Sequence, residues 1–203
     1  MLDYVRRTVA YNFVIDRFGR VYRIVPEDQV ANHAGHSVWS DEQWVYLDLN
    51  PSFLGVSFEA ETGSTISAAQ LRAGAMLTEM LRSRYAIPAG NCITHGQVSV
   101  NPSNMRVGYH TDWGSSFPFE ELGLPDNYAR ALPAVSFFGF EHDAGFLRVA
   151  GPRLSESVTL AEEDVRRAAT ISGVPEARYR KALQERYRVR IAALHGQTAH
   201  WTR

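Results

Sequence analysis

The sequence has one cysteine, no long apolar run and no marked excess of charge of either sign. The single cysteine excludes an internal disulfide, so the core has to hold the fold, with or without a metal. The 21 basic residues nearly balance the 22 acidic ones, which gives no electrostatic reason to expect nucleic acid or a lipid surface. No run approaches the roughly 18 apolar residues that span a bilayer, and the first ten residues lack the apolar stretch of a secretion signal. We therefore expect no nucleic acid partner and no membrane span.

The 203 residues, 45% of them hydrophobic, suffice for one well-buried domain with an appendage. Alternating apolar residues around a polar turn predict a β-hairpin over residues 11–25. Residues 27–50 follow neither the helical nor the strand period and predict a long irregular loop, which is usually functional. A buried strand is expected at residues 53–60.

The clearest helix is expected over residues 68–85, with Ser67 as N-cap and apolar residues at three- and four-residue steps. The sequence NCITH then predicts a brief strand that ends in His95. Proline and glycine predict a loop-rich stretch over residues 101–133. Strands that bracket a helix, with residues of metal-ligand type at both ends of a loop, suggest a site at a sheet edge.

The character of the sequence changes near residue 129. An aromatic connector is followed by two predicted helices, which are separated at Gly173 and Pro175. We therefore divide the chain into a domain of residues 1–128 and a C-terminal helical extension of residues 129–203. The extension is interpreted as a packing appendage, and the alternative is a separate binding module.

Several residues of metal-ligand type cluster in the predicted loops. His95 and Asp112 lie at the two ends of one loop, where they can form either a hydrogen-bonded pair or part of a zinc site. His33 lies beside small residues that permit close approach of a ligand, and its alternative is a surface position. The thiol of Cys92, near His95, raises the alternative of a cysteine hydrolase, but its apolar surroundings favour packing.

Five stretches in consistent order carry a resemblance to a known family: YNFVIDRFGRVYRIV, NHAGHS, LNPSFLGVSFEAE, the helix from residue 68 to IP at 87–88, and THGQVSVNP through HTDWGSSFPF. The chain resembles peptidoglycan recognition proteins and the type 2 N-acetylmuramoyl-L-alanine amidases of phages and bacteria over residues 9–120. The resemblance implies a mixed sheet with helices against it. It also implies hydrolysis, with a catalytic zinc ion, of the amide between N-acetylmuramic acid and L-alanine.

By position, the resemblance implies that His95 and Asp112 are zinc ligands and that Tyr11 lies beside the zinc-bound water. His110 stands where the family commonly has a lysine, so its help to the oxyanion depends on pH. His33 and Asn32, in the loop that resembles the family's HAG loop, are implied to contact the muropeptide. Some bacterial members carry a catalytic glutamate in the strand that is Gly55–Glu61 here, where Glu59 is the first acid and Ser57 stands in register.

One departure concerns the first zinc histidine, which in the family lies on a strand upstream of the hairpin. Only ten residues precede the hairpin here, and none is histidine. We therefore expect an α/β fold that lacks the first strand and helix, with residues 2–13 as the tail of that helix and its lead into the hairpin. A third zinc ligand is not assigned, although His33 or His110 offers a substitute.

Two further functions stay open at this point. One is a module that binds peptidoglycan or muropeptide without cutting it, and the other is a truncated amidase without activity. An amidase of intact wall would work in the cell envelope or be secreted if a signal peptide precedes this start. Without a signal, a cytoplasmic recycling role is expected.

Overall fold

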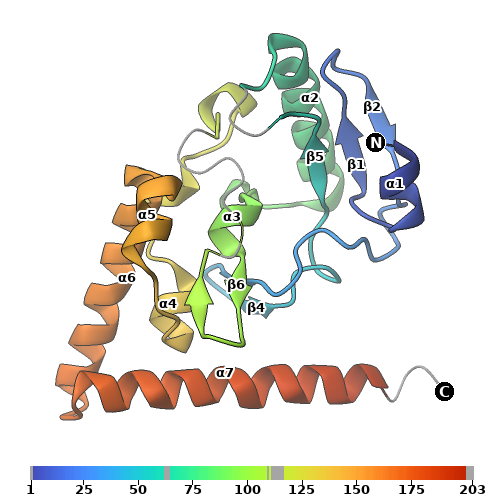
Figure 1. Ribbon diagram of the computed structural model, residues 1–203. Helices are drawn as coiled ribbons and strands as arrows, with labels where there is room; N and C mark the ends of the chain where they lie inside the picture. Colours follow the sequence, from blue (N-terminus) through green and yellow to red (C-terminus); the bar gives the residue numbers. More distant parts are fainter. Residues whose placement is uncertain (1, 62–64, 109, 111–116, 200–203) are drawn as a thin grey trace.

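The computed structural model describes residues 2–61, 65–108, 110 and 117–199 (Figure 1). Its N-terminal part is a mixed sheet in which β1 (Phe13–Ile15) pairs antiparallel with β2 (Val21–Arg23) and parallel with β5 (Val56–Phe58). The predicted hairpin is confirmed. Asp16 closes its turn, since one carboxylate oxygen accepts hydrogen bonds from the backbone N–H groups of residues 18 and 20 at 2.9 Å. The predicted strand at 53–60 is shorter than expected and half-buried rather than buried.

Helix α2 (Ala68–Tyr85) packs on this sheet and confirms the clearest prediction from the sequence. Ser67 accepts a hydrogen bond from the Gln70 backbone, and the Gln70 side chain accepts one from the Ser67 backbone. This capping box satisfies two N–H groups that the first turn leaves without helical partners. Leu77 and Leu81 face the sheet and form a small core with the side chains of β1.

The stretch of residues 27–50 is not irregular throughout, as the sequence predicted. It contains the antiparallel pair β3 (Val38–Ser40) and β4 (Val45–Leu47). The turn between them depends on Asp41, whose Oδ1 accepts hydrogen bonds from the backbone of Gln43 and Trp44 at 2.9 and 2.8 Å. Strands of three residues are too short to show a period, and for this reason the sequence pattern did not reveal them.

The strand predicted to end in His95 is wrong. His95 begins the one-turn helix α3 (His95–Val98), and the two-residue strands β6 (Val100–Asn101) and β7 (Arg106–Val107) follow as a hairpin. The β-branched residues before His95 favour a strand locally, but no neighbouring strand pairs with them in the described part of the chain.

The predicted break between the last two long helices is confirmed: α6 (Pro152–Ile171) ends shortly before Gly173, which has a φ of 64°, and α7 (Glu176–Ala199) follows. The aromatic connector contains helical segments that the sequence did not predict. The other short helical segments of the described chain are α1 (Leu2–Arg7), η1 (Ala89–Asn91), η3 (Glu120–Leu122), η4 (Asn127–Ala129), α4 (Pro133–Phe138) and α5 (Ala144–Ala150).

The largest core cluster joins the middle of the chain to the C-terminal helices. Its buried side chains include Val38, Val100, Val135, Val158 and Tyr187. The division at residue 128 stays a prediction. The described residues form the mixed sheet with flanking helices and the C-terminal helical part that the sequence indicates.

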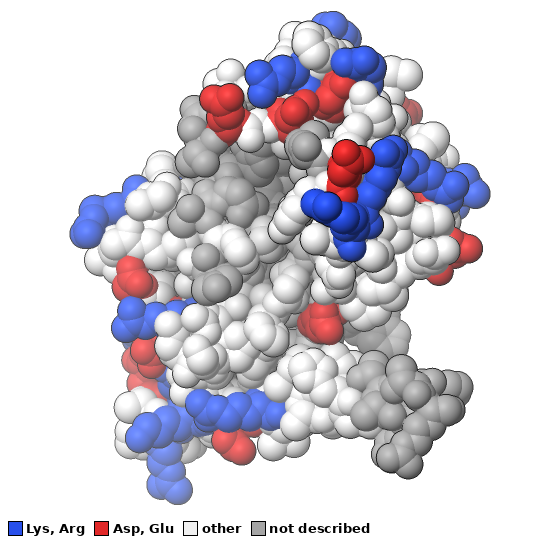
Figure 2. All heavy atoms as spheres, turned by 45° about the vertical axis from the view of Figure 1, so that its right-hand side comes forward, with Lys and Arg blue, Asp and Glu red and all other residues white. Residues whose placement is uncertain are grey.

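Charged side chains lie along the upper, left and lower margins of the face in Figure 2, and groups of both signs also lie right of its centre. The lower margin corresponds to α7, and the upper margin to the α2 end of the molecule. Among the described residues, no helix is both long and apolar enough to cross a bilayer.

Candidate functional site

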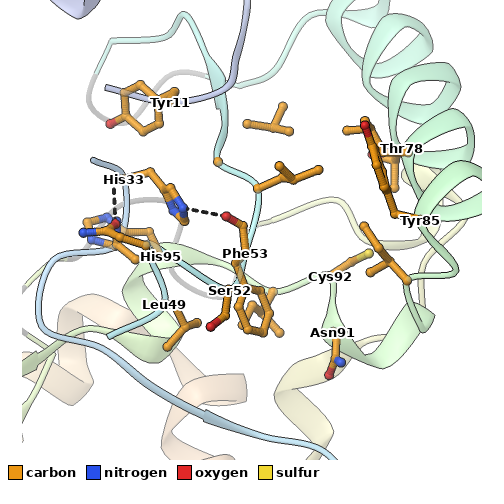
Figure 3. A pocket seen from close by; sticks show the side chains of 18 of the residues that line it. Tyr11, His33, Leu49, Ser52, Phe53, Thr78, Tyr85, Asn91, Cys92 and His95 are labelled. Atoms are coloured by element: carbon orange, nitrogen blue, oxygen red, sulfur yellow. Dashed lines mark hydrogen bonds between the residues drawn. The ribbon is translucent and has the colours of Figure 1, made fainter. Parts of the chain in front are cut away.

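A cavity of about 620 Å³ lies between α2, β5 and the neighbouring loops. Tyr11, His33 and His95 line one end of it, and Thr78 and Tyr85 line the other (Figure 3). β5 is an outer strand of the described sheet, and it forms part of the cavity wall. The fold therefore brings together three of the residues singled out from the sequence, although they are far apart along the chain.

Tyr11 reaches the cavity from a turn with an unusual backbone. Its φ is 62° and that of Val9 is 52°, both in the left-handed region that residues other than glycine rarely adopt. The buried side chain of Asn12 holds this turn: its amide donates to the Pro26 carbonyl at 3.3 Å, and its oxygen accepts from the Gly55 N–H at 2.9 Å. Asn12 thus ties the hairpin to β5 at the point where Tyr11 leaves the backbone.

Hydrogen bonds at both the backbone and the ring fix the position of His33. The side-chain oxygen of Asn50 accepts hydrogen bonds from the backbone N–H groups of His33 and Ala34 at 2.9 and 2.8 Å. The ring Nε2 lies 3.0 Å from the Phe53 carbonyl oxygen, which only accepts, so Nε2 carries the proton. A Cβ on Gly55 would lie 2.5 Å from both Cβ and Cγ of His33, so only glycine fits beside the ring.

Burial lowers the pKa of His33 below its usual value, because it penalises the charged imidazolium. The hydrogen bond to the Phe53 carbonyl opposes this effect, and the nearby His95 adds to it. His33 is therefore neutral near pH 7, and it can offer Nδ1 only as an acceptor.

His95 is the first residue of α3, and buried polar contacts hold this short helix. The hydroxyls of Thr94 and Tyr128 are 2.8 Å apart, and the Gln97 amide donates to the Asn127 carbonyl at 2.8 Å. Sequence reasoning did not identify Asn127 or Tyr128 as supports of the site. No local motif marks them, since each acts across about 30 residues of chain.

His110 lies next to His95, with ring centroids 4.3 Å apart and ring planes inclined by 32°. Asp112, the second predicted zinc ligand, lies outside the described residues. In the described part of the chain, no three His, Cys, Asp or Glu side chains are grouped closely enough to hold a metal ion. The two imidazoles are suitable zinc donors, but the described residues alone do not complete a ligand set.

Asn32 and Glu59 do not line the main cavity. The exposed Asn32 side chain donates to the Thr8 carbonyl at 3.0 Å and does not line the cavity. Glu59 accepts a hydrogen bond from the Arg17 backbone and lies at a shallow surface groove, whereas Ser57 lines the main cavity.

Cys92 also lines the cavity, at the end away from His33. Burial raises the pKa of its thiol, and the neighbouring Arg82 guanidinium opposes only part of this rise. The thiol is thus protonated near neutral pH, a state that makes a poor nucleophile. This agrees with the interpretation of Cys92 as a packing residue.

The chain matches a family model described as N-acetylmuramoyl-L-alanine amidase (Amidase_2) over residues 2–115. This covers more than half of the 203 residues. Comparison with curated proteins gives no match.

Among solved structures, the chain is similar to AmiD from E. coli, an N-acetylmuramyl-L-alanine amidase in complex with the substrate anhydro-N-acetylmuramic acid-L-Ala-D-γ-Glu-L-Lys. The TM-score is 0.51 at 19% identity, over 76% of this chain and 71% of AmiD, and it shows a shared fold. A selenomethionine derivative of AmpD matches with a TM-score of 0.47 at 27% identity over 57% of this chain. AmpDh3 from Pseudomonas aeruginosa, in complex with anhydromuramic pentapeptide, matches with a TM-score of 0.41 at 24% identity over 51% of this chain. The chain spans 58% of the AmpD chain and 40% of the AmpDh3 chain.

Proposed function

Because the chain belongs to the N-acetylmuramoyl-L-alanine amidase family, whose model matches residues 2–115, we propose that it hydrolyses the amide bond between N-acetylmuramic acid and L-alanine. The substrate is peptidoglycan or a muropeptide released from it. The observation that carries the proposal is the cavity at which Tyr11, His33 and His95 meet within the matched residues. The ligand named in the AmiD complex contains the same sugar–alanine link.

The proposal includes a zinc ion held by His95 and Asp112, with the third protein ligand not assigned. When bound, zinc polarises a carbonyl and lowers the pKa of a water molecule, which supplies a nucleophile at neutral pH. His95 is suited to the ligand role, because buried polar contacts hold the helix on which it lies.

The other residues of the chain have roles in binding and orientation. The Tyr11 hydroxyl is a hydrogen-bond donor for the scissile carbonyl as negative charge develops on its oxygen. His110 is a second donor, but only in its protonated form. His33 is neutral, and we assign it to contact with the muropeptide. Asn32 stays a predicted contact, although its amide is engaged by the Thr8 carbonyl.

The substrate also bears on where the protein works. Peptidoglycan lies outside the cytoplasmic membrane. We propose the cell envelope or secretion if a signal peptide precedes this start, and a cytoplasmic recycling role otherwise.

Zinc content and cleavage, measured on the same preparations, test the proposal. Elemental analysis measures the zinc content of the wild type, His95→Ala and His36→Ala. Each protein is also incubated with an anhydromuramyl tripeptide, and mass spectrometry identifies the products. His36 is a suitable control because it is an exposed histidine that does not line the cavity.

We expect near-stoichiometric zinc and release of the tripeptide with the wild type and the control, and loss of both with His95→Ala. Absence of zinc and of cleavage in the wild type would contradict the enzymatic proposal. Retained muropeptide binding would then indicate the non-catalytic module, and loss of binding would indicate an inactive amidase.

A further inference from the structure

Helix α2 presents three polar residues to the cavity at its end away from His95. Thr78, Arg82 and Tyr85 follow one another at steps of four and three residues, so they share one face of the helix, and all three line the cavity. We call them the polar stripe. Figure 3 labels Thr78 and Tyr85. The remaining α2 residue at the cavity is the apolar Leu81. The stripe therefore sets the chemistry of this end of the cavity.

Arg82 is the member of the stripe that points to a ligand. It is half-buried, its Nε donates to the Ile87 carbonyl at 3.3 Å, and in the described part of the chain no carboxylate pairs with it. A guanidinium has five N–H donors and stays charged. Among the described residues, only the Ile87 carbonyl accepts a hydrogen bond from this side chain, so its remaining donors are available to water or to a ligand.

Arg180, another arginine with little exposed surface, has carboxylate partners within the chain. Its side chain is 12% exposed, and it is paired with both Glu162 and Glu176. Neither of the two acidic residues that line the cavity forms a described ion pair with Arg82. Glu27 is paired with Arg23, and Asp28 is exposed and takes part in no described ion pair. Arg82 therefore keeps a charge with which an anion from outside the described chain can pair at this cavity.

We propose that Arg82 binds a free carboxylate of the stem peptide and so selects substrates that carry one. This inference rests on the proposed function. In a peptide that continues from L-alanine through a D-γ-Glu residue, the γ-linkage leaves the α-carboxylate of that residue free. The guanidinium fork matches a carboxylate through two parallel hydrogen bonds, and an amide in its place removes the charge and one acceptor. The neutral Thr78 hydroxyl on the same face adds a donor.

The test compares two anhydromuramyl tripeptides that differ only in this group, one with the free α-carboxylate and one with the α-amide. Binding is measured by titration calorimetry with the wild type, Arg82→Gln, Arg82→Lys and Arg84→Gln. Arg84 is the matched control: it lies in the same last turn of α2 and does not line the cavity. The melting temperature of each variant is measured in parallel.

We expect the wild type and Arg84→Gln to bind the acid about 10- to 100-fold more tightly than the amide, the range of a charge-assisted hydrogen bond. Arg82→Gln should bind both peptides equally, and Arg82→Lys should keep part of the preference. A wild type that binds both peptides equally overturns the role of Arg82 while the proposed function stands. A lower melting temperature of Arg82→Gln with an unchanged preference also overturns it, because Arg82 would then only support the end of α2. A wild type that binds neither peptide removes the proposed function, and the inference with it.

Discussion

The substitution Gly55→Ala tests whether the site depends on the close approach of β5 to His33. The added Cβ would lie 2.5 Å from Cβ and Cγ of His33 and 2.9 Å from its Cδ2. Contacts below 3.0 Å do not occur between well-packed groups, so the ring has to move. Its hydrogen bond to the Phe53 carbonyl would be lost or lengthened as a result.

The expected cost follows from this geometry. Gly55 does not have a positive φ, so alanine meets no backbone penalty, and the effect comes from the contact alone. Overpacking of one methyl group costs about 1–3 kcal/mol. In a chain of this size, that corresponds to a decrease of about 2–4 °C in melting temperature for each kcal/mol.

Urea unfolding of Gly55→Ala, with Gly90→Ala as control, measures this cost. A Cβ on Gly90 would meet only the flexible Arg130 guanidinium, at 3.4 Å. The double variant Gly55→Ala/His33→Gly should recover most of the loss that the clash causes, and Gly55→Ala/His33→Ala less, because alanine keeps the Cβ at 2.5 Å. Equal stability of Gly55→Ala and Gly90→Ala would refute the reasoning.

Three further expectations concern stability. Burial raises the pKa of Asp41, but hydrogen bonds to its carboxylate outweigh this effect and lower the pKa to about 2. The stability that the ionised carboxylate contributes is therefore complete above about pH 4 and is lost as the pH falls toward 2. Asp41→Asn should lower the free energy of unfolding by about 1 kcal/mol at pH 7 and by less at pH 2. Urea unfolding at both pH values measures this difference, and an equal loss at both would contradict it. Ser67→Ala should cost about 1 kcal/mol through loss of the capping box, measured by thermal unfolding against Ser83→Ala on the exposed side of the same helix. Glu162→Gln should lower the free energy of unfolding by about 1–3 kcal/mol, because it removes a charge that pairs with the largely buried Arg180 side chain. A melting temperature unchanged from the wild type would argue against that role.

Elements with strong local signals could be predicted from the sequence. The helix over residues 68–85 has its cap, its period and its end within 20 residues of chain, so no distant contact is needed to recognise it. The hairpin is equally local, because Asp16 closes the turn between its strands. The break between the last two helices at Gly173 and Pro175 could likewise be predicted from local residues.

Elements decided by distant contacts could not be read in this way. The residues before His95 favour a strand but pair with none in the described part of the chain; α3 begins at His95 itself, and buried bonds to Asn127 and Tyr128 hold it. The pair β3–β4 is too short for a period, and its turn depends on one carboxylate. The loop motif indicates a ligand contact for Asn32, which stays a prediction, and only the fold shows that its amide donates to the Thr8 carbonyl.

The sequence by itself determined the residue types at the site and the order of the motifs that identify the family. It also determined the local elements that carry them, since caps, turns and helical periods act over a few residues. Only the tertiary structure decided that Tyr11, His33 and His95 line one cavity, and that Gly55 has to be glycine for His33 to fit. Only the tertiary structure showed that Arg82 faces this cavity without an acid partner among the described residues. These properties are distances between residues far apart in the chain, and packing sets such distances, whereas local preference does not.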